Sequence, residues 1–184
     1  MRAARTGESA LLLLDVVEVL ERNGVAYAVI GAMAAAIYGV VRASMDADAV
    51  ISLPPHQLGD ISREYRTAGF RTELRDGEPD DPIGAVLVIS DIYGNRVDLL
   101  AGLRGLDGAA FTRAIEVPFQ GRGLRFIGRE DFIAMKLFAH GPQDLSDARY
   151  ALAAASETLD FELLRRLTAG FGPDTVAALA KLSP

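Results

Sequence analysis

The stretch Arg42-Ala-Ser-Met-Asp-Ala-Asp-Ala-Val-Ile-Ser52 has the pattern of a β-strand, but it contains two acidic residues, Asp46 and Asp48. Side chains of a strand alternate between its two faces, so these carboxylates point the same way, roughly 6–7 Å apart along the chain. A third acid, Asp98, lies in a second strand pattern, Gly94-Asn-Arg-Val-Asp-Leu-Leu100. Isolated buried charges are unfavourable, and carboxylate oxygens are ligands that Mg²⁺ prefers. We therefore expect the three aspartates to meet on neighbouring strands and to bind Mg²⁺ or Mn²⁺.

Each of these acids also has an ordinary structural explanation. Asp46 is compatible with an N-cap or a loop position, and Asp48 with an ion pair to Arg42. Asp98 is compatible with a pair to Arg96 or with an exposed strand position. A purely structural origin would require a separate ordinary explanation for each of the three acids. Their occurrence together, with a glycine turn at Gly31 nearby in the predicted sheet, therefore favours a functional cluster.

The composition narrows the classes of function. The chain has 184 residues, of which 50% are hydrophobic, and this is enough for one core. The absence of cysteine excludes disulfides and thiolate zinc sites, and two histidines are too few for a histidine-based metal site. The net charge of −6 argues against a broad, non-specific grip on nucleic acid. A local basic groove stays open, since Arg122, Arg125 and Arg129 lie close together in sequence.

The beginning of the chain resembles a targeting signal only superficially. Asp15, Glu18 and Glu21 follow the apolar run from Leu11 to Leu14, and apolar residues then recur at helical spacing. An amphipathic helix is the better interpretation. No stretch approaches the length that spans a bilayer, so we expect a cytoplasmic protein without a membrane partner.

The hydrophobic pattern predicts an α+β fold, a mixed β-sheet flanked by helices with a C-terminal helical tail. Strands are expected at 25–30, 47–53, 70–74, 85–90, 95–100, 114–119 and 124–127. Helices are expected before the stop signal at residues 23–24 and at 32–38, 54–68, 129–140, 142–156, 161–169 and 173–182, with an exposed loop at 75–82. We expect residues 1–128 to form the α/β core and residues 129–184 to pack on it within one structural domain.

A glycine turn follows the first predicted strand, in Gly31-Ala-Met-Ala-Ala-Ala36. The free N–H groups at the start of the next helix form a natural phosphate site. An ordinary turn is the alternative. The turn gains interest because Asp46 and Asp48 follow about fifteen residues later, at one end of the same predicted sheet.

Lys136 is the only charged residue between Phe132 and Ala139 in a nearly apolar helix. Either its ammonium extends to the surface, or it faces a polar site and serves as a cation for a triphosphate. Asp144 and Asp147 lie one helical turn apart, and either one can orient Lys136. The alternative is that they are acids of a first helical turn, which stabilise a helix N-terminus.

The order of these motifs resembles the nucleotidyltransferase superfamily of the DNA polymerase β type. Within it, the chain is most similar to the group of small bacterial and archaeal proteins that includes AbiEii-type toxins. The resemblance covers roughly residues 25–155, and its distinctive parts are the twin aspartates and the segment from Lys136 to Asp147. It departs from the family pattern at Ala32, which lacks the usual hydroxyl, and also at Gln143 and Ala49.

The resemblance implies roles for individual residues. By it, the metal ligands are Asp46, Asp48 and Asp98, and the catalytic residues are these three and Lys136. The nucleotide-binding residues that it implies are Gly31, Ala32, Arg42, Ser44, Lys136 and Asp144. Ser44 would supply the hydroxyl that Ala32 lacks.

The resemblance also implies an activity, the transfer of a nucleoside monophosphate from a nucleoside triphosphate to an acceptor hydroxyl. The acceptor could be a tRNA end, a protein hydroxyl or a small molecule such as an aminoglycoside, and a toxin role would bring an antitoxin partner. The competing hypothesis is a nucleotidyltransferase-like module that binds a nucleotide or a protein without turnover. A third is a purely structural α+β domain.

Overall fold

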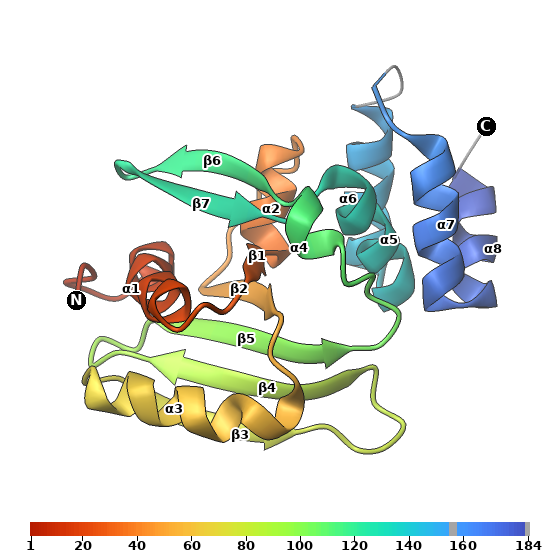
Figure 1. Ribbon diagram of the computed structural model, residues 1–184. Helices are drawn as coiled ribbons and strands as arrows, with labels where there is room; N and C mark the ends of the chain where they lie inside the picture. Colours follow the sequence, from red (N-terminus) through yellow and green to blue (C-terminus); the bar gives the residue numbers. More distant parts are fainter. Residues whose placement is uncertain (155–157, 183–184) are drawn as a thin grey trace.

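The computed structural model describes residues 1–154 and 158–182, and within them seven strands form one mixed sheet (Figure 1). The strands are β1 (Tyr27–Val29), β2 (Asp46–Ile51), β3 (Arg71–Asp76), β4 (Ile83–Ser90), β5 (Arg96–Leu103), β6 (Ile115–Phe119) and β7 (Arg122–Phe126). The helices are α1 (Ser9–Arg22), α2 (Gly31–Ile37), α3 (Leu58–Thr67), α4 (Ala110–Arg113), α5 (Arg129–Ala139), α6 (Pro142–Ala153), α7 (Phe161–Phe171) and α8 (Pro173–Leu182), with a 3-10 turn at Pro55–Gln57. The predicted α+β class, with helices flanking the sheet and a helical C-terminal part, is confirmed.

The strand order β3-β4-β5-β2-β1-β7-β6 brings the two aspartate-bearing strands together. β2 and β5 are parallel neighbours, and their register places Asp48 opposite Asp98 and Asp46 opposite Arg96. β1 runs antiparallel to β2 on its other side, so the end of β1 lies beside Asp48. Because α2 begins directly after β1, the sheet topology also brings the start of this helix to the two aspartates.

Alternating burial along β5 explains why a strand can carry charges. Val97 and Leu99 are fully buried in the main core, whereas Arg96 and Asp98 on the opposite face are half-buried. Helices α1 and α3 pack against the β2 to β5 part of the sheet, and the Tyr65 hydroxyl of α3 donates a hydrogen bond to the Val16 carbonyl of α1 at 2.9 Å. The charged residues of β2 and β5 therefore lie on the face that these two helices leave free.

The C-terminal helices form a group of their own at one end of the sheet (Figure 1). α5 contacts α6, α7 and α8, and the Phe138 and Phe171 rings lie with their centroids 4.8 Å apart. α5 also contributes the buried Phe132 and Ile133 to the main core. In the described residues, no helix has both the length and the apolar character needed to cross a membrane.

Several predicted boundaries are wrong. Residues 75–76 belong to β3 rather than to the loop, because Arg75 pairs with Val86 and Asp76 with Ala85. Their exposure explains the error, since an edge strand of charged side chains has no apolar alternation. The first strand covers only Tyr27–Val29, α7 continues to Phe171, and the four-residue α4 was not predicted. α6 ends at Ala153, and the last predicted helical residues, 155–156, lie outside the described residues.

Candidate active site

Among the described residues, the carboxylates of Asp46 and Asp48 have no direct side-chain partner. Both residues are half-buried on the same face of β2. The hydroxyl of Ser44 donates a hydrogen bond to the backbone carbonyl of Asp46 at 2.9 Å, which orders the approach to the strand. In the described residues, neither carboxylate takes part in an ion pair or a side-chain hydrogen bond. Two acceptor groups are therefore free to bind a ligand.

Gly31 brings the start of α2 against Asp48. A Cβ atom at this position would lie 2.2 Å from Oδ2 of Asp48, and the backbone has a left-handed φ of +63°. The N–H of Ile30 donates to the carbonyl of Asp48 at 2.9 Å, which fixes the two segments together. Glycine is required on both counts, for the backbone conformation and for the close approach. Ala32, the next residue, is buried and offers no hydroxyl at the site.

Burial is the main cause that raises the pKa of Asp48 above its ordinary value. The negative charges of Asp98 and Asp46 raise it further, and the positive charges of Lys136 and Arg42 oppose the shift. The carboxylate thus lies in a place with an excess of negative charge and little water. A bound cation would relieve this excess.

Asp98 differs from the other two acids because it is bonded to Arg96. The Nε of Arg96 donates to Oδ1 at 2.6 Å and its Nη2 to Oδ2 at 2.5 Å. This pair is one of the ordinary explanations that the sequence left open. In the part of the chain that the structure describes, no group of three or more His, Cys, Asp or Glu side chains is arranged to hold a metal ion. The three-aspartate metal site therefore stays a prediction.

The chemistry of Asp46 and Asp48 nevertheless fits a divalent cation. Their oxygens are hard ligands, they have no competing partner among the described residues, and Asp48 lies in an excess of negative charge. Two protein carboxylates together with substrate phosphates are a common way to bind Mg²⁺. Asp98 could join them only after it is released from Arg96.

Lys136 is held inside the protein by two aspartates rather than at the surface. Its Nζ lies 2.6 Å from Oδ1 of Asp144 and 3.2 Å from Oδ2 of Asp147, and the lysine side chain is only 12% exposed. The carboxylate of Asp147 is fully buried and accepts a hydrogen bond from Nε2 of Gln143 at 2.8 Å. Its Oδ2 also lies 3.5 Å from Nη2 of Arg42. Asp147 therefore connects the two cations that act on Asp48.

Asp147 was not among the site residues that the sequence predicted, although it contacts both cations of this region. The sequence offered a signal, the one-turn spacing from Asp144, but acids near a helix start have a common structural role. Its complete burial and its contact with both Lys136 and Arg42 come from tertiary structure, which no local pattern encodes.

The other predicted nucleotide-binding residues divide between two hollows beside α2. Gly31, Lys136 and Asp144 line a cavity of about 200 Å³. A second cavity of about 180 Å³ takes in Ala32, Arg42, Ser44 and Asp46. Asp48 contacts Gly31 of the first cavity and lies two residues after Asp46 of the second on the same face of β2.

Comparisons with known proteins give a fold but no close relative. No protein-family model matches the chain, and no curated protein matches it. The solution structure of the antibiotic-resistance factor ANT(2″)-Ia superposes with a TM-score of 0.58 at 17% sequence identity, covering 92% of this chain and 94% of that one. The crystal structure of ANT(2″)-Ia in complex with adenylyl-2″-tobramycin gives a TM-score of 0.56 at 17% identity, covering 87% and 94%.

A third neighbour is an antigenic nucleotidyltransferase-like protein from Paracoccidioides brasiliensis. Its TM-score is 0.54 at 13% identity, and the match covers 97% of this chain and 95% of that one. The fold is that of a nucleotidyltransferase. At such low identity the likeness concerns the fold alone, and the AbiEii-like subgroup stays a prediction.

The two carboxylates and two cationic side chains lie around the start of α2, where one ligand could meet both kinds of charge. Asp46 and Asp48 offer oxygen ligands, while Lys136 and Arg42 offer positive charge close enough to lower the pKa of Asp48. A phosphate group with a bound cation carries both kinds of charge and can satisfy both sides.

Proposed function

We propose that this chain is a nucleotidyltransferase, which uses Mg²⁺ or Mn²⁺ to move a nucleoside monophosphate from a triphosphate to an acceptor hydroxyl. One observation carries the proposal. Asp48 lies beside Gly31, opposite Asp98 on the neighbouring strand and within electrostatic reach of Lys136, and neither it nor Asp46 on the same face of β2 has a direct side-chain partner among the described residues. The fold shared with ANT(2″)-Ia supports it.

The acidic and the basic side chains of the site have different proposed roles. Asp46 and Asp48 would hold the divalent cation, which when bound supplies Lewis-acid polarisation of the phosphoryl oxygens. Lys136 and Arg42 would neutralise and orient the triphosphate. Asp144 and Asp147 position Lys136, because they hold its ammonium from two sides.

The reaction forms one bond and breaks one. The acceptor oxygen bonds to the α-phosphorus, and the bond from this phosphorus to the bridging oxygen of pyrophosphate breaks. Pyrophosphate leaves with that electron pair. The hydroxyl proton passes to the carboxylate of Asp98, once Arg96 has released it, and then to water.

A small molecule is the acceptor that the neighbours favour, since ANT(2″)-Ia was crystallised with adenylyl-2″-tobramycin. An RNA or protein acceptor, membership of the AbiEii-like group and a toxin role with an antitoxin partner rest on sequence resemblance alone. They stay predictions.

The test is label transfer from each of four α-labelled nucleoside triphosphates, with Mg²⁺ or Mn²⁺ and separate acceptors. The acceptors are total RNA, the protein itself and a panel of hydroxylated small molecules. We expect metal-dependent product with the wild type and none with Asp48→Asn, whose fold is verified by circular dichroism. Equal transfer by both proteins, or none by the wild type on every acceptor, would contradict the proposal.

The non-catalytic binding module has one observation in its favour, the hold of Arg96 on both oxygens of Asp98. If this pair persists when nucleotide binds, Asp98 can serve neither as a base nor as a ligand. Titration calorimetry separates the two functions. Metal-dependent triphosphate binding without any labelled product identifies the module, whereas binding with product identifies the enzyme.

A further inference from the structure

We infer that the cavity between the sheet and α5 binds the acceptor, and that this acceptor is a neutral alcohol with an apolar ring system. The inference rests on the proposed function and adds the chemical class of the second substrate. Its evidence is the lining of the cavity, the place of the cavity beside Asp48, and its volume.

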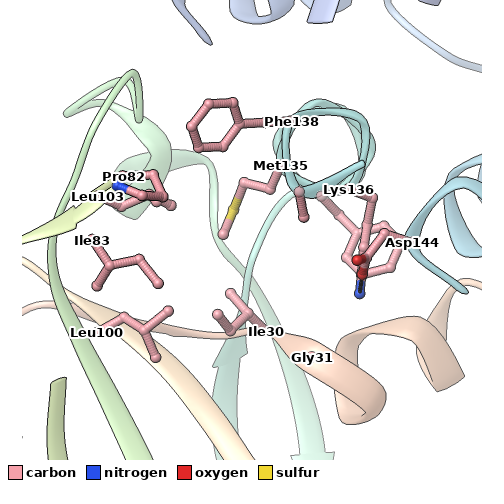
Figure 2. Close-up of a pocket in the computed structure, with 12 residues that line it drawn as sticks. Ile30, Gly31, Pro82, Ile83, Leu100, Leu103, Met135, Lys136, Phe138 and Asp144 are labelled. Atoms are coloured by element: carbon pink, nitrogen blue, oxygen red, sulfur yellow. Dashed lines mark hydrogen bonds and ion pairs between the residues drawn. The ribbon is translucent and has the colours of Figure 1, made fainter. Parts of the chain in front are cut away.

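The walls of the cavity are almost wholly apolar (Figure 2). Leu100 comes from β5 and Ile30 from the junction between β1 and α2, and Met135 extends from α5 toward this floor of the cavity. The remaining apolar lining residues are Pro82, Ile83, Leu103, Phe132, Phe138 and Ala139. Burial of an apolar group against such surfaces is favourable because it removes apolar area from water.

The cavity lies next to the carboxylates where transfer would occur. Gly31 lines it and is also the residue that touches Asp48. Leu100 follows Asp98 by two residues on the same face of β5, so the sheet surface continues from the acid into the cavity. A ring buried against Leu100 would therefore present a hydroxyl toward the aspartates.

The polar lining residues argue against a cationic or strongly polar occupant. Asp144 is the single carboxylate among the described lining residues, and its Oδ1 lies 2.6 Å from Nζ of Lys136. A polycation would find no unpaired anion here. A nucleobase would find no free polar side chain among the described lining residues for its edges, and buried hydrogen-bonding groups without a partner weaken binding. A neutral apolar ring incurs neither cost.

The volume sets the size of the ring system. An apolar protein cavity of about 150 Å³ is large enough to bind benzene. The cavity here measures about 200 Å³, so it accommodates more than one simple ring and suits two fused rings. 2-Naphthol has this size and also carries a hydroxyl, which makes it a suitable probe.

The experiment measures binding by titration calorimetry without nucleotide or metal, using 2-naphthol and the polycationic aminoglycoside tobramycin. The variant Ala139→Phe fills the cavity, and Met135→Gln makes its wall polar at similar volume. Ala180→Phe is the matched control, because Ala180 is an exposed residue of α8 that does not line the cavity. The melting temperature of each variant verifies that it folds.

We expect 2-naphthol to bind the wild type and Ala180→Phe with equal affinity, and both cavity variants at least tenfold more weakly. Tobramycin should not bind in the cavity, so Ala139→Phe and Met135→Gln should leave any binding of tobramycin unchanged. Absence of 2-naphthol binding, equal binding by all four proteins, or tobramycin binding that Ala139→Phe removes would overturn the inference. Failure of the proposed function has a different signature, with no label transfer to any acceptor while cavity-dependent 2-naphthol binding remains.

Discussion

Gly31→Ala is the sharpest test of the site geometry, because glycine has two separable roles at this position. The added Cβ would lie 2.2 Å from Oδ2, 3.1 Å from Cγ and 3.3 Å from Cβ of Asp48. The substitution also forces alanine into a left-handed backbone with φ of +63°. The first effect displaces the carboxylate, and the second strains the backbone.

Gly24→Ala is a matched control, since Gly24 has φ of +65° and no atom within 4 Å of the place its Cβ would take. Left-handed backbone costs an L-residue roughly 1–2 kcal/mol, and both variants share this cost. Overpacking in a filled space costs about 1–3 kcal/mol, and only Gly31→Ala adds it. We therefore expect Gly31→Ala to lose about 1–3 kcal/mol more stability than Gly24→Ala.

The assay is urea unfolding of the two variants in the wild-type and Asp48→Ala backgrounds. Removal of the carboxylate should abolish the excess, leaving the two glycine variants equal within about 0.5 kcal/mol. Stabilisation by Mg²⁺ should fall in Gly31→Ala and persist in Gly24→Ala, because only Gly31→Ala moves Asp48, the proposed metal ligand. An excess that survives in the Asp48→Ala background would refute the contact between α2 and Asp48.

Two further predictions concern the charges of the site. The pKa of Asp48 is raised by folding, so the folded state binds more protons than the unfolded state as pH rises from the ordinary value of 3.8, and stability falls over that window. Asp48→Asn should thus raise the melting temperature of the metal-free protein at pH 7 and have little effect below about pH 3.5. Scanning calorimetry across this pH range measures both effects. A variant less stable than the wild type at pH 7 would contradict the prediction. Arg96→Gln frees Asp98 from a partly exposed pair at a cost of about 1 kcal/mol or less. It should increase the Mg²⁺-induced rise in melting temperature, and an unchanged or smaller rise would show that Asp98 is not available to the cation.

The sequence predicted the elements around the site well, because each had a strong local signal. Alternation around Asp46 and Asp48 indicated a strand, and Gly31 marked the boundary before a helix. The register that sets Asp48 opposite Asp98 is a tertiary property, but the order of strands made it a reasonable expectation. The prediction for the edge strand β3 ended two residues too early, because the exposed charged residues at its end have the composition of a loop.

The sequence did not determine which charged side chains pair with each other. Nothing local distinguishes Asp98 bonded to Arg96 from Asp98 free to bind a cation, and both were open alternatives. Asp147 was likewise undecided, since its contacts with Lys136 and Arg42 depend on how α6 packs beside α5 and the loop before β2. Side chains of opposite charge choose partners by distance in the folded state, which the chain order does not give.

The contrast between the two kinds of aspartate explains how this fold can keep a site ready for a cation. Asp98, Asp144 and Asp147 each have a basic partner, so their charges are balanced without a ligand. Asp46 and Asp48 have none among the described residues, and burial makes the charge of Asp48 unfavourable. A ligand that binds only the folded state adds its binding free energy to stability, and the gain is largest where it removes an existing repulsion. The unpaired acids should therefore dominate the response of the protein to Mg²⁺, and without metal their charge should lower its stability.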